Sequence, residues 1–201
     1  TVSLTYNANG GKGDDQTISS IANNATVTTI ANPFTRDGYS FVGWDTSANG
    51  TGSIKAGIDV VQVDGKGENV LYAIWKANTD TEYTVEFYYQ KPDGTYPQDA
   101  NESVVRHDGT TDEIVSVTET DKTPKDNKYV YDATNENNKE SGKVEADGSL
   151  VLKLYFKLNK ATYKVVHRFQ TVDGTSYVED TKYPDQTLEG TVGQSTNAQA
   201  Y

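Results

Sequence analysis

The sequence predicts a β-dominated α+β protein built from small domains in tandem, each with the order strand–strand–short helix or crossover–strand–strand. Three observations predict this class. Thr, Val and Tyr, which favour strands, are abundant, with 14 Tyr among 201 residues, and Leu is scarce. Apolar and polar residues alternate over several segments, as they do in half-buried strands. One pattern of strands and turns also recurs along the chain.

An internal repeat organises the second half of the chain. Two copies of one pattern follow each other at an offset of 80 residues, and Gly109-Thr110 recurs as Gly190-Thr191 at an offset of 81. Identical residues in the same order at a fixed interval mark a tandem repeat. These identical residues are Tyr83, Val85, Gln90, Asp93, Gly94 and Thr95 in the first copy and Tyr163, Val165, Gln170, Asp173, Gly174 and Thr175 in the second.

The N-terminal residues are a more distant copy. Asp37–Phe41 and Asn127–Tyr131 begin similar stretches, and each leads through a glycine-containing turn to a closing strand, Val70–Lys76 or Leu150–Lys157. We therefore expect three domains whose short polar connectors leave neighbours little freedom. The expected domains are repeat 1 (residues 1–77), repeat 2 (residues 78–160) and repeat 3 (residues 161–201), which holds only the first half of the pattern.

Repeat 2 shows the expected elements most clearly. Residues 83–89 alternate between apolar and polar, which predicts a strand, and Pro92–Thr95 has the Pro and Gly of a tight turn. The polar segment Thr118–Asp126, interrupted by Pro124, has room for a single helical turn, and Thr28–Pro33 takes its place in repeat 1. The alternation predicts sheets with one covered face and one wet face.

Repeat 3 is expected to need a partner for its first strand. Unpaired strand edges expose backbone donors and acceptors, which natural proteins usually cover. We therefore expect Thr162–Phe169 to pair either with repeat 2 or with another chain. Self-association through the third repeat is a candidate interaction on this ground.

Composition excludes several functions. Without Cys, the chain has no thiolate chemistry, and a net charge of −11 argues against binding to nucleic acid or anionic lipid. No apolar run reaches the roughly 20 residues of a membrane span. Because the sequence has no Met and its start does not resemble a signal peptide, we expect an internal segment of a longer chain, without signal or wall anchor.

No catalytic, metal or cofactor site is predicted. His107 beside Asp108 is better explained as an exposed loop residue than as a general base, and His167 falls on a strand position. Nucleophile-elbow, phosphate-loop and zinc-protease motifs are absent. The Asp-Gly turns lack the alternating carboxylates of a calcium loop, and hairpin geometry explains them. We therefore expect a protein that is not an enzyme.

Repeat 1 resembles the Listeria–Bacteroides repeat, the B-repeat type first associated with internalins. The resemblance rests on Tyr6–Gly11, on Asn32–Trp44 with its Arg-x-Gly-Tyr-x-Phe-x-Gly-Trp core, and on Leu71–Trp75. Repeats 2 and 3 are similar to the mucin-binding-protein-like (MucBP-like) repeats, on the shorter evidence of Tyr-x-Val followed by Asp-Gly-Thr. Both resemblances imply β-grasp, ubiquitin-like domains of secreted or wall-attached bacterial proteins.

The families imply an extracellular stalk, or else an adhesive module that itself binds host glycoprotein, mucin glycan or a receptor. Tyr88 and Tyr155 are the candidate binding residues, because they fall on the strand face opposite the main apolar stripe. Tyr is also a good cross-strand residue on a wet face, so a purely structural role stays open. Trp44 and Trp75 belong to the family core pattern and are expected to pack inside repeat 1.

Overall fold

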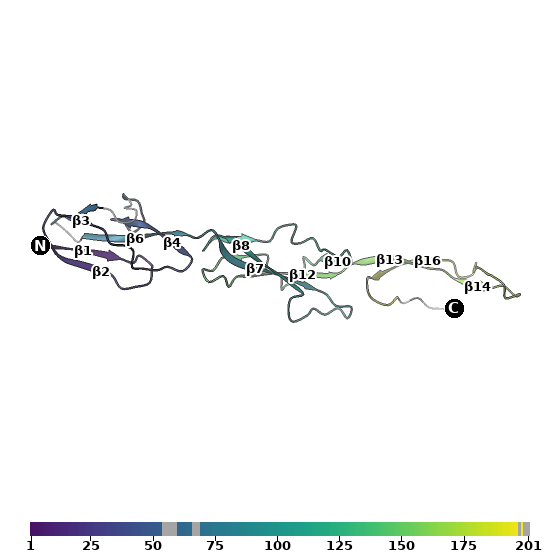
Figure 1. Ribbon diagram of the computed structural model, residues 1–201. Helices are drawn as coiled ribbons and strands as arrows, with labels where there is room; N and C mark the ends of the chain where they lie inside the picture. Colours follow the sequence, from purple (N-terminus) through teal and green to yellow (C-terminus); the bar gives the residue numbers. More distant parts are fainter. Residues whose placement is uncertain (54–59, 66–68, 197, 199–201) are drawn as a thin grey trace. The chain divides into compact units, whose positions relative to one another are not determined.

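The computed structural model describes residues 1–53, 60–65, 69–196 and 198 (Figure 1). This part of the chain forms sixteen strands joined by turns and contains no helix. It groups into two compact units. Unit 1 comprises Thr1–Thr84, Val105–Val115 and Gly142–Leu150, and unit 2 comprises Val85–Val104, Ser116–Ser141 and Val151–Tyr201. The protein is therefore β-dominated, as the composition predicted.

The N-terminal sheet has the strand order β2-β1-β6-β4. Its strands are β1 (Val2–Asn7), β2 (Gln16–Ile21), β4 (Tyr39–Asp45) and β6 (Asn69–Ala77). The central strands β1 and β6 run parallel, whereas β2 and β4 pair antiparallel with them on the outside. Two short strands, β3 (Thr26–Thr28) and β5 (Val60–Gln62), pair antiparallel as a separate small sheet.

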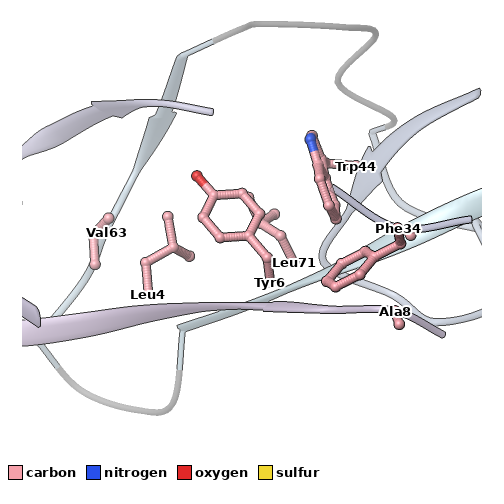
Figure 2. Packing of buried hydrophobic residues seen from close by; sticks show 8 residues of the cluster. Leu4, Tyr6, Ala8, Phe34, Trp44, Val63 and Leu71 are labelled. Carbon is pink, nitrogen blue, oxygen red and sulfur yellow. The ribbon is translucent and has the colours of Figure 1, made fainter. Parts of the chain in front are cut away.

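One face of this sheet carries the core of unit 1 (Figure 2). Leu4 and Tyr6 extend from the same side of β1, as alternation in a strand requires, and buried Ala8 follows just beyond the strand. Trp44 is fully buried among aromatic rings, and its indole N–H donates to the Ile30 carbonyl (3.0 Å). The other buried members of the cluster are Phe34, Val63, Leu71 and Ala73.

Trp75 packs at the margin of the same core. It is partly buried, and its indole N–H donates to the Ala8 carbonyl (3.0 Å). Both tryptophans therefore have the packing role that the sequence predicted.

The central sheet repeats the plan of the first, with the order β8-β7-β12-β10. Its strands are β7 (Thr81–Tyr89), β8 (Glu102–Gly109), β10 (Tyr129–Tyr131) and β12 (Val151–Leu158). Thr84 donates to Leu150 and Gln90 donates to Phe156, so the partners advance together as in parallel strands. As β3 and β5 do, β9 (Ile114–Ser116) and β11 (Ser141–Lys143) form a small separate sheet.

The helical turn expected at Thr118–Asp126 is not formed, and the segment is a series of turns. Thr118 and Asp121 bond reciprocally, each side chain accepting the other's backbone N–H, which is the pattern of a helix start. The Lys122 N–H follows with a bond to the Thr118 carbonyl (3.3 Å). One such turn before Pro124 is too short to propagate a helix. A crossover without a helix thus connects the two strand pairs.

Repeat 3 forms two hairpin-like pairs. Strand β13 (Lys160–Val165) pairs antiparallel with β16 (Gln186–Thr191), and β14 (Arg168–Gln170) pairs with β15 (Tyr177–Glu179). The residues expected to pair with repeat 2 or another chain therefore pair within their own segment, so that expectation was wrong in its partner. The reason is that β16 pairs with the edge of β13, which the sequence pattern had left without a partner.

Candidate functional site

The two candidate tyrosines lie side by side on the central sheet. Tyr88 from β7 and Tyr155 from β12 stack with their ring centroids 4.5 Å apart and their planes 7° from parallel. Both alternate with core residues, because Phe87 and Phe156 are buried on the opposite face of the same strands. The sequence thus placed these two residues on one face, and the structure brings them into direct contact.

Tyr88 is far less accessible than a wet sheet face implies. Its exposed fraction is 4%, and its hydroxyl donates to Glu86 Oε2 (2.7 Å). Burial, and after it the bond to Glu86, raises the pKa of Tyr88. The ammonium of Lys153 lies 5.6 Å from the ring centroid of Tyr88 and 3.7 Å from a Glu86 oxygen. Tyr155 and Lys153 thus occupy the surroundings of this ring, which fits a packing role.

Tyr155 is partly exposed and contacts a third tyrosine that the sequence pattern did not single out. Tyr96, from the loop between β7 and β8, meets Tyr155 edge-on with a centroid distance of 5.1 Å. The Tyr96 hydroxyl donates to Asp132 Oδ2 (3.3 Å). Burial is the main cause that raises the pKa of Tyr96. We call Tyr88, Tyr96 and Tyr155 the tyrosine cluster.

The loop after β10 places polar groups beside the tyrosine cluster, and we call these groups its rim. Asn138 accepts the Tyr155 N–H through Oδ1 (2.9 Å) and donates through Nδ2 to the Asp132 carbonyl (2.8 Å). Lys157 donates to Asp132 Oδ1 (3.0 Å). Burial alone raises the pKa of Asp132, but the bonds from Lys157 and Thr134 outweigh it and bring the pKa below its usual value. The rim is therefore a pre-ordered set of a carboxylate, an amide and an ammonium.

This arrangement is suited to contact with a ligand. Partly exposed aromatic rings beside fixed polar groups can stack on a ligand and hydrogen-bond to it. His107 is exposed, and its Nδ1 lies 3.1 Å from Glu82 Oε1. Among the residues that the structure describes, no group of three or more His, Cys, Asp or Glu side chains is arranged to hold a metal ion. Those residues also contain no helix suited to crossing a membrane.

A second candidate surface lies on the N-terminal sheet. A groove of about 380 Å³ runs along the polar side of β1 and β6. Two of its lining residues are bonded, with Asn7 Nδ2 donating to Asp15 Oδ2 (2.8 Å), and Tyr72 supplies the one aromatic ring among them. Its lining residues are Ser3, Thr5, Asn7, Asp15, Asn69, Val70 and Tyr72. Because side chains alternate along β1, Ser3, Thr5 and Asn7 lie on the face opposite the core and line this groove.

A tyrosine–carboxylate pair at β10, an outer strand of the central sheet, makes stability depend on alkaline pH. Tyr131 donates to Glu140 (2.5 Å), and burial followed by this bond raises the pKa of Tyr131 to about 12. An unfolded tyrosine ionises near 10. The folded state therefore holds the phenol proton more tightly, and this contribution is complete below pH 10 and is lost between pH 10 and 12.

We therefore expect Tyr131→Phe to flatten the alkaline loss of stability. Urea midpoints of the unsubstituted protein should fall more steeply between pH 10 and 12 than those of the variant. Tyr177→Phe is the control, because Tyr177 is 65% exposed, and it should keep the original slope. If the urea midpoints of Tyr131→Phe and the unsubstituted protein fall equally with pH, the ionisation of this phenol is not coupled to folding.

Comparison with family models agrees with the description of repeat 1. Residues 3–74 match the model of the Listeria-Bacteroides repeat domain. Among solved structures, the chain is similar to the type 2 repeat of the mucus binding protein MUB from Lactobacillus reuteri, with 12% identity and a TM-score of 0.19. That alignment covers 79% of this chain and 98% of the other. A search of curated proteins found no match. The match over residues 3–74 is to the family whose resemblance the Arg-x-Gly-Tyr-x-Phe-x-Gly-Trp core carried.

Proposed function

We propose that this chain is a non-enzymatic repeat segment of a bacterial cell-surface or secreted protein, where it acts as a spacer that presents another domain. One observation carries the proposal: the strand plan β2-β1-β6-β4 recurs as β8-β7-β12-β10. Small domains of one plan, chained by short connectors, build length with contacts mainly between neighbours. The Listeria–Bacteroides repeat at residues 3–74 supports the extracellular setting.

We assign the β-grasp fold to repeats 1 and 2, with domain boundaries 1–77, 78–160 and 161–201. A parallel central pair made of the first and last strands, flanked by antiparallel strands, supports this assignment for repeat 1. The advancing bonds between β7 and β12 support it for repeat 2. The MucBP-like identity of repeats 2 and 3 belongs to the same proposal and rests on their shared motifs.

The second candidate function is adhesion, with a host glycoprotein or mucin glycan as the ligand. The partly exposed ring of Tyr155, beside Tyr96 and the ordered Asp132, favours it. Aromatic stacking combined with carboxylate and amide hydrogen bonds is a usual way to hold a sugar. Tyr88 contributes by supporting Tyr155 from beneath, because its own ring is buried.

Titration of the intact chain against purified mucin and a glycan array separates the two functions. The spacer function predicts no saturable binding. Adhesion predicts saturable binding that Tyr96→Ala and Tyr155→Ala each weaken at least tenfold. Tyr72→Ala is the matched control, since Tyr72 is a partly exposed sheet tyrosine of the N-terminal groove, as Tyr155 is of the central sheet. Binding lost only in Tyr72→Ala would move the adhesive site to that groove.

Self-association through repeat 3 is a third proposal, favoured by its exposed apolar side chains. Phe169 is 50% exposed, and Val166, Val178 and Leu188 are exposed as well. Burial of such groups against a second copy is favourable in proportion to the area removed from water. Sedimentation velocity should then show dimers whose fraction rises with concentration and falls in Phe169→Ser. A monomer at all concentrations would refute it.

A further inference from the structure

One residue ties the end of β6 to both of the sheets next to it in the chain. Asn78 follows β6 directly and lies within unit 1. Its N–H donates to the Gly38 carbonyl (2.9 Å), and its carbonyl accepts the Thr111 N–H (3.0 Å). Gly38 immediately precedes β4, and Thr111 lies just after β8. Both peptide groups of Asn78 are thus fixed, one by the sheet before it and one by the sheet after it.

The same pair of bonds occurs within unit 2. Asn159 follows β12 directly, donates to the Lys128 carbonyl (2.7 Å) and accepts the Val192 N–H (2.9 Å). Lys128 immediately precedes β10, and Val192 lies just after β16. Asn159 stands 81 residues after Asn78, and Val192 stands 81 residues after Thr111. We call each two-bond arrangement an asparagine clamp.

The turn that presents the donor N–H is also the same in both clamps. Glu113 donates to Thr110 (3.0 Å), and Gln194 donates to Thr191 (3.1 Å). The third residue of each turn has a positive φ, +65° at Asp112 and +82° at Gly193. An aspartate pays a conformational cost there that glycine does not. Retention of one backbone geometry by two different residues indicates that the turn serves a backbone function.

Side chains reinforce the first clamp more than the second. The Asp112 carboxylate accepts bonds from the Tyr39 hydroxyl and from Lys143 (2.7 Å), and these bonds, Lys143 first, lower the pKa of Asp112. The buried hydroxyls of Thr81 and Thr111 bond each other at 2.7 Å. In the second clamp Gly193 has no side chain, and Gln194 Nε2 donates instead to the Pro92 carbonyl (2.7 Å). The backbone bonds are therefore the shared element.

We propose that the asparagine clamps are two copies of one joint that couples each repeat to the next and removes the freedom of a peptide linker. Rotation of one repeat against the next about the connector breaks either the bond from the asparagine N–H or the bond to its carbonyl. The inference deepens the proposed spacer function and takes its biological meaning from it, since a spacer must transmit orientation along its length.

Spin-label distance measurements on the full chain test the second clamp. The chain has no Cys, so cysteines introduced at the exposed positions Glu136 and Thr181 are the sole labelling sites. Val192→Pro deletes the donor N–H while fitting the first central position of a turn, where Pro before Gly is favoured. Val192→Ala is the matched control, because it keeps the N–H and removes only the side chain.

We expect the width of the distance distribution to at least double in Val192→Pro and to stay unchanged in Val192→Ala. Equal widths in all three proteins, or equal broadening in both variants, would overturn the joint. Amide exchange of the unsubstituted chain gives a second test that needs no variant. The amides of Asn78, Thr111, Asn159 and Val192 lie outside strands, yet should exchange at least tenfold more slowly than solvent-exposed loop amides. Exchange at loop rates contradicts the joint, whereas mucin binding would contradict the spacer alone.

Discussion

We expect Trp44→Ala to destabilise unit 1 by about 3–5 kcal/mol, the usual cost of truncating a buried tryptophan to alanine. Trp44 is fully buried and contacts Tyr6 edge-on at a centroid distance of 4.8 Å and Phe41 at 5.0 Å. The substitution removes these contacts and leaves a cavity. It also takes away the indole N–H that the Ile30 carbonyl accepts. Denaturant unfolding monitored by far-ultraviolet circular dichroism measures the loss.

Val42→Ala is the control for Trp44→Ala. Val42 lies on the same strand, β4, but is 39% exposed, so its truncation should cost less than about 1 kcal/mol. Similar unfolding midpoints for the two variants would mean that the aromatic cluster does not carry the stability of the N-terminal sheet.

Gly38→Ala should have the second large effect, because position 38 is constrained twice. Its φ is +73°, and an added Cβ would lie 2.7 Å from the Thr111 side chain and 2.8 Å from the Ala146 Cβ. A positive φ alone costs an L-residue about 1–2 kcal/mol. Overpacking adds about 1–3 kcal/mol, so we expect a total loss of about 2–5 kcal/mol. The loss should appear in the unfolding of unit 1.

Gly94→Ala separates the two costs. Gly94 has a similar φ of +85°, but a Cβ added there would meet no atom within 4 Å. The variant should therefore show the backbone cost alone, about 1–2 kcal/mol. If Gly38→Ala costs no more stability than Gly94→Ala, the close packing of position 38 against Thr111 and Ala146 does not constrain the protein.

The long strands were predictable because each buries one face. Alternation placed β7 and β12 close to their observed bounds, since Val85, Leu152, Leu154 and Phe156 follow the period of two. The three-residue strands β9 and β11 gave no such signal, because a strand so short has too few residues for a period. The helical turn at Thr118–Asp126 failed for a related reason: the local capping pattern is present, but Pro124 ends it within one turn.

The tyrosine cluster was only half predictable. Strand alternation places Tyr88 and Tyr155 on one face, and the structure stacks them. Tyr96 and Asp132 reach the cluster from loops, whose paths follow no sequence period. The burial of Tyr88 accompanies its contacts with Tyr155 and Lys153. The one available signal for Tyr96 was its place directly after the repeated Asp-Gly-Thr turn.

The asparagine clamps use backbone groups, which leave little trace in composition or periodicity. A trace existed nonetheless. The repeat offset changes from 80 at the first hairpin to 81 at Gly109-Thr110 and Gly190-Thr191, the residues that lead into the donor turns. The extra residue keeps Asn159 and Val192 in step with Asn78 and Thr111.

Scalar couplings across hydrogen bonds, observed by NMR, test most directly whether repeat 2 has the strand plan of repeat 1. The predicted result is a coupling from the Thr84 amide to the Leu150 carbonyl and one from the Gln90 amide to the Phe156 carbonyl. Both partners then advance by six residues, as in the parallel pair β1–β6. Couplings whose partners run in opposite directions along β7 and β12, or their absence while β13–β16 couplings appear, would contradict a shared plan.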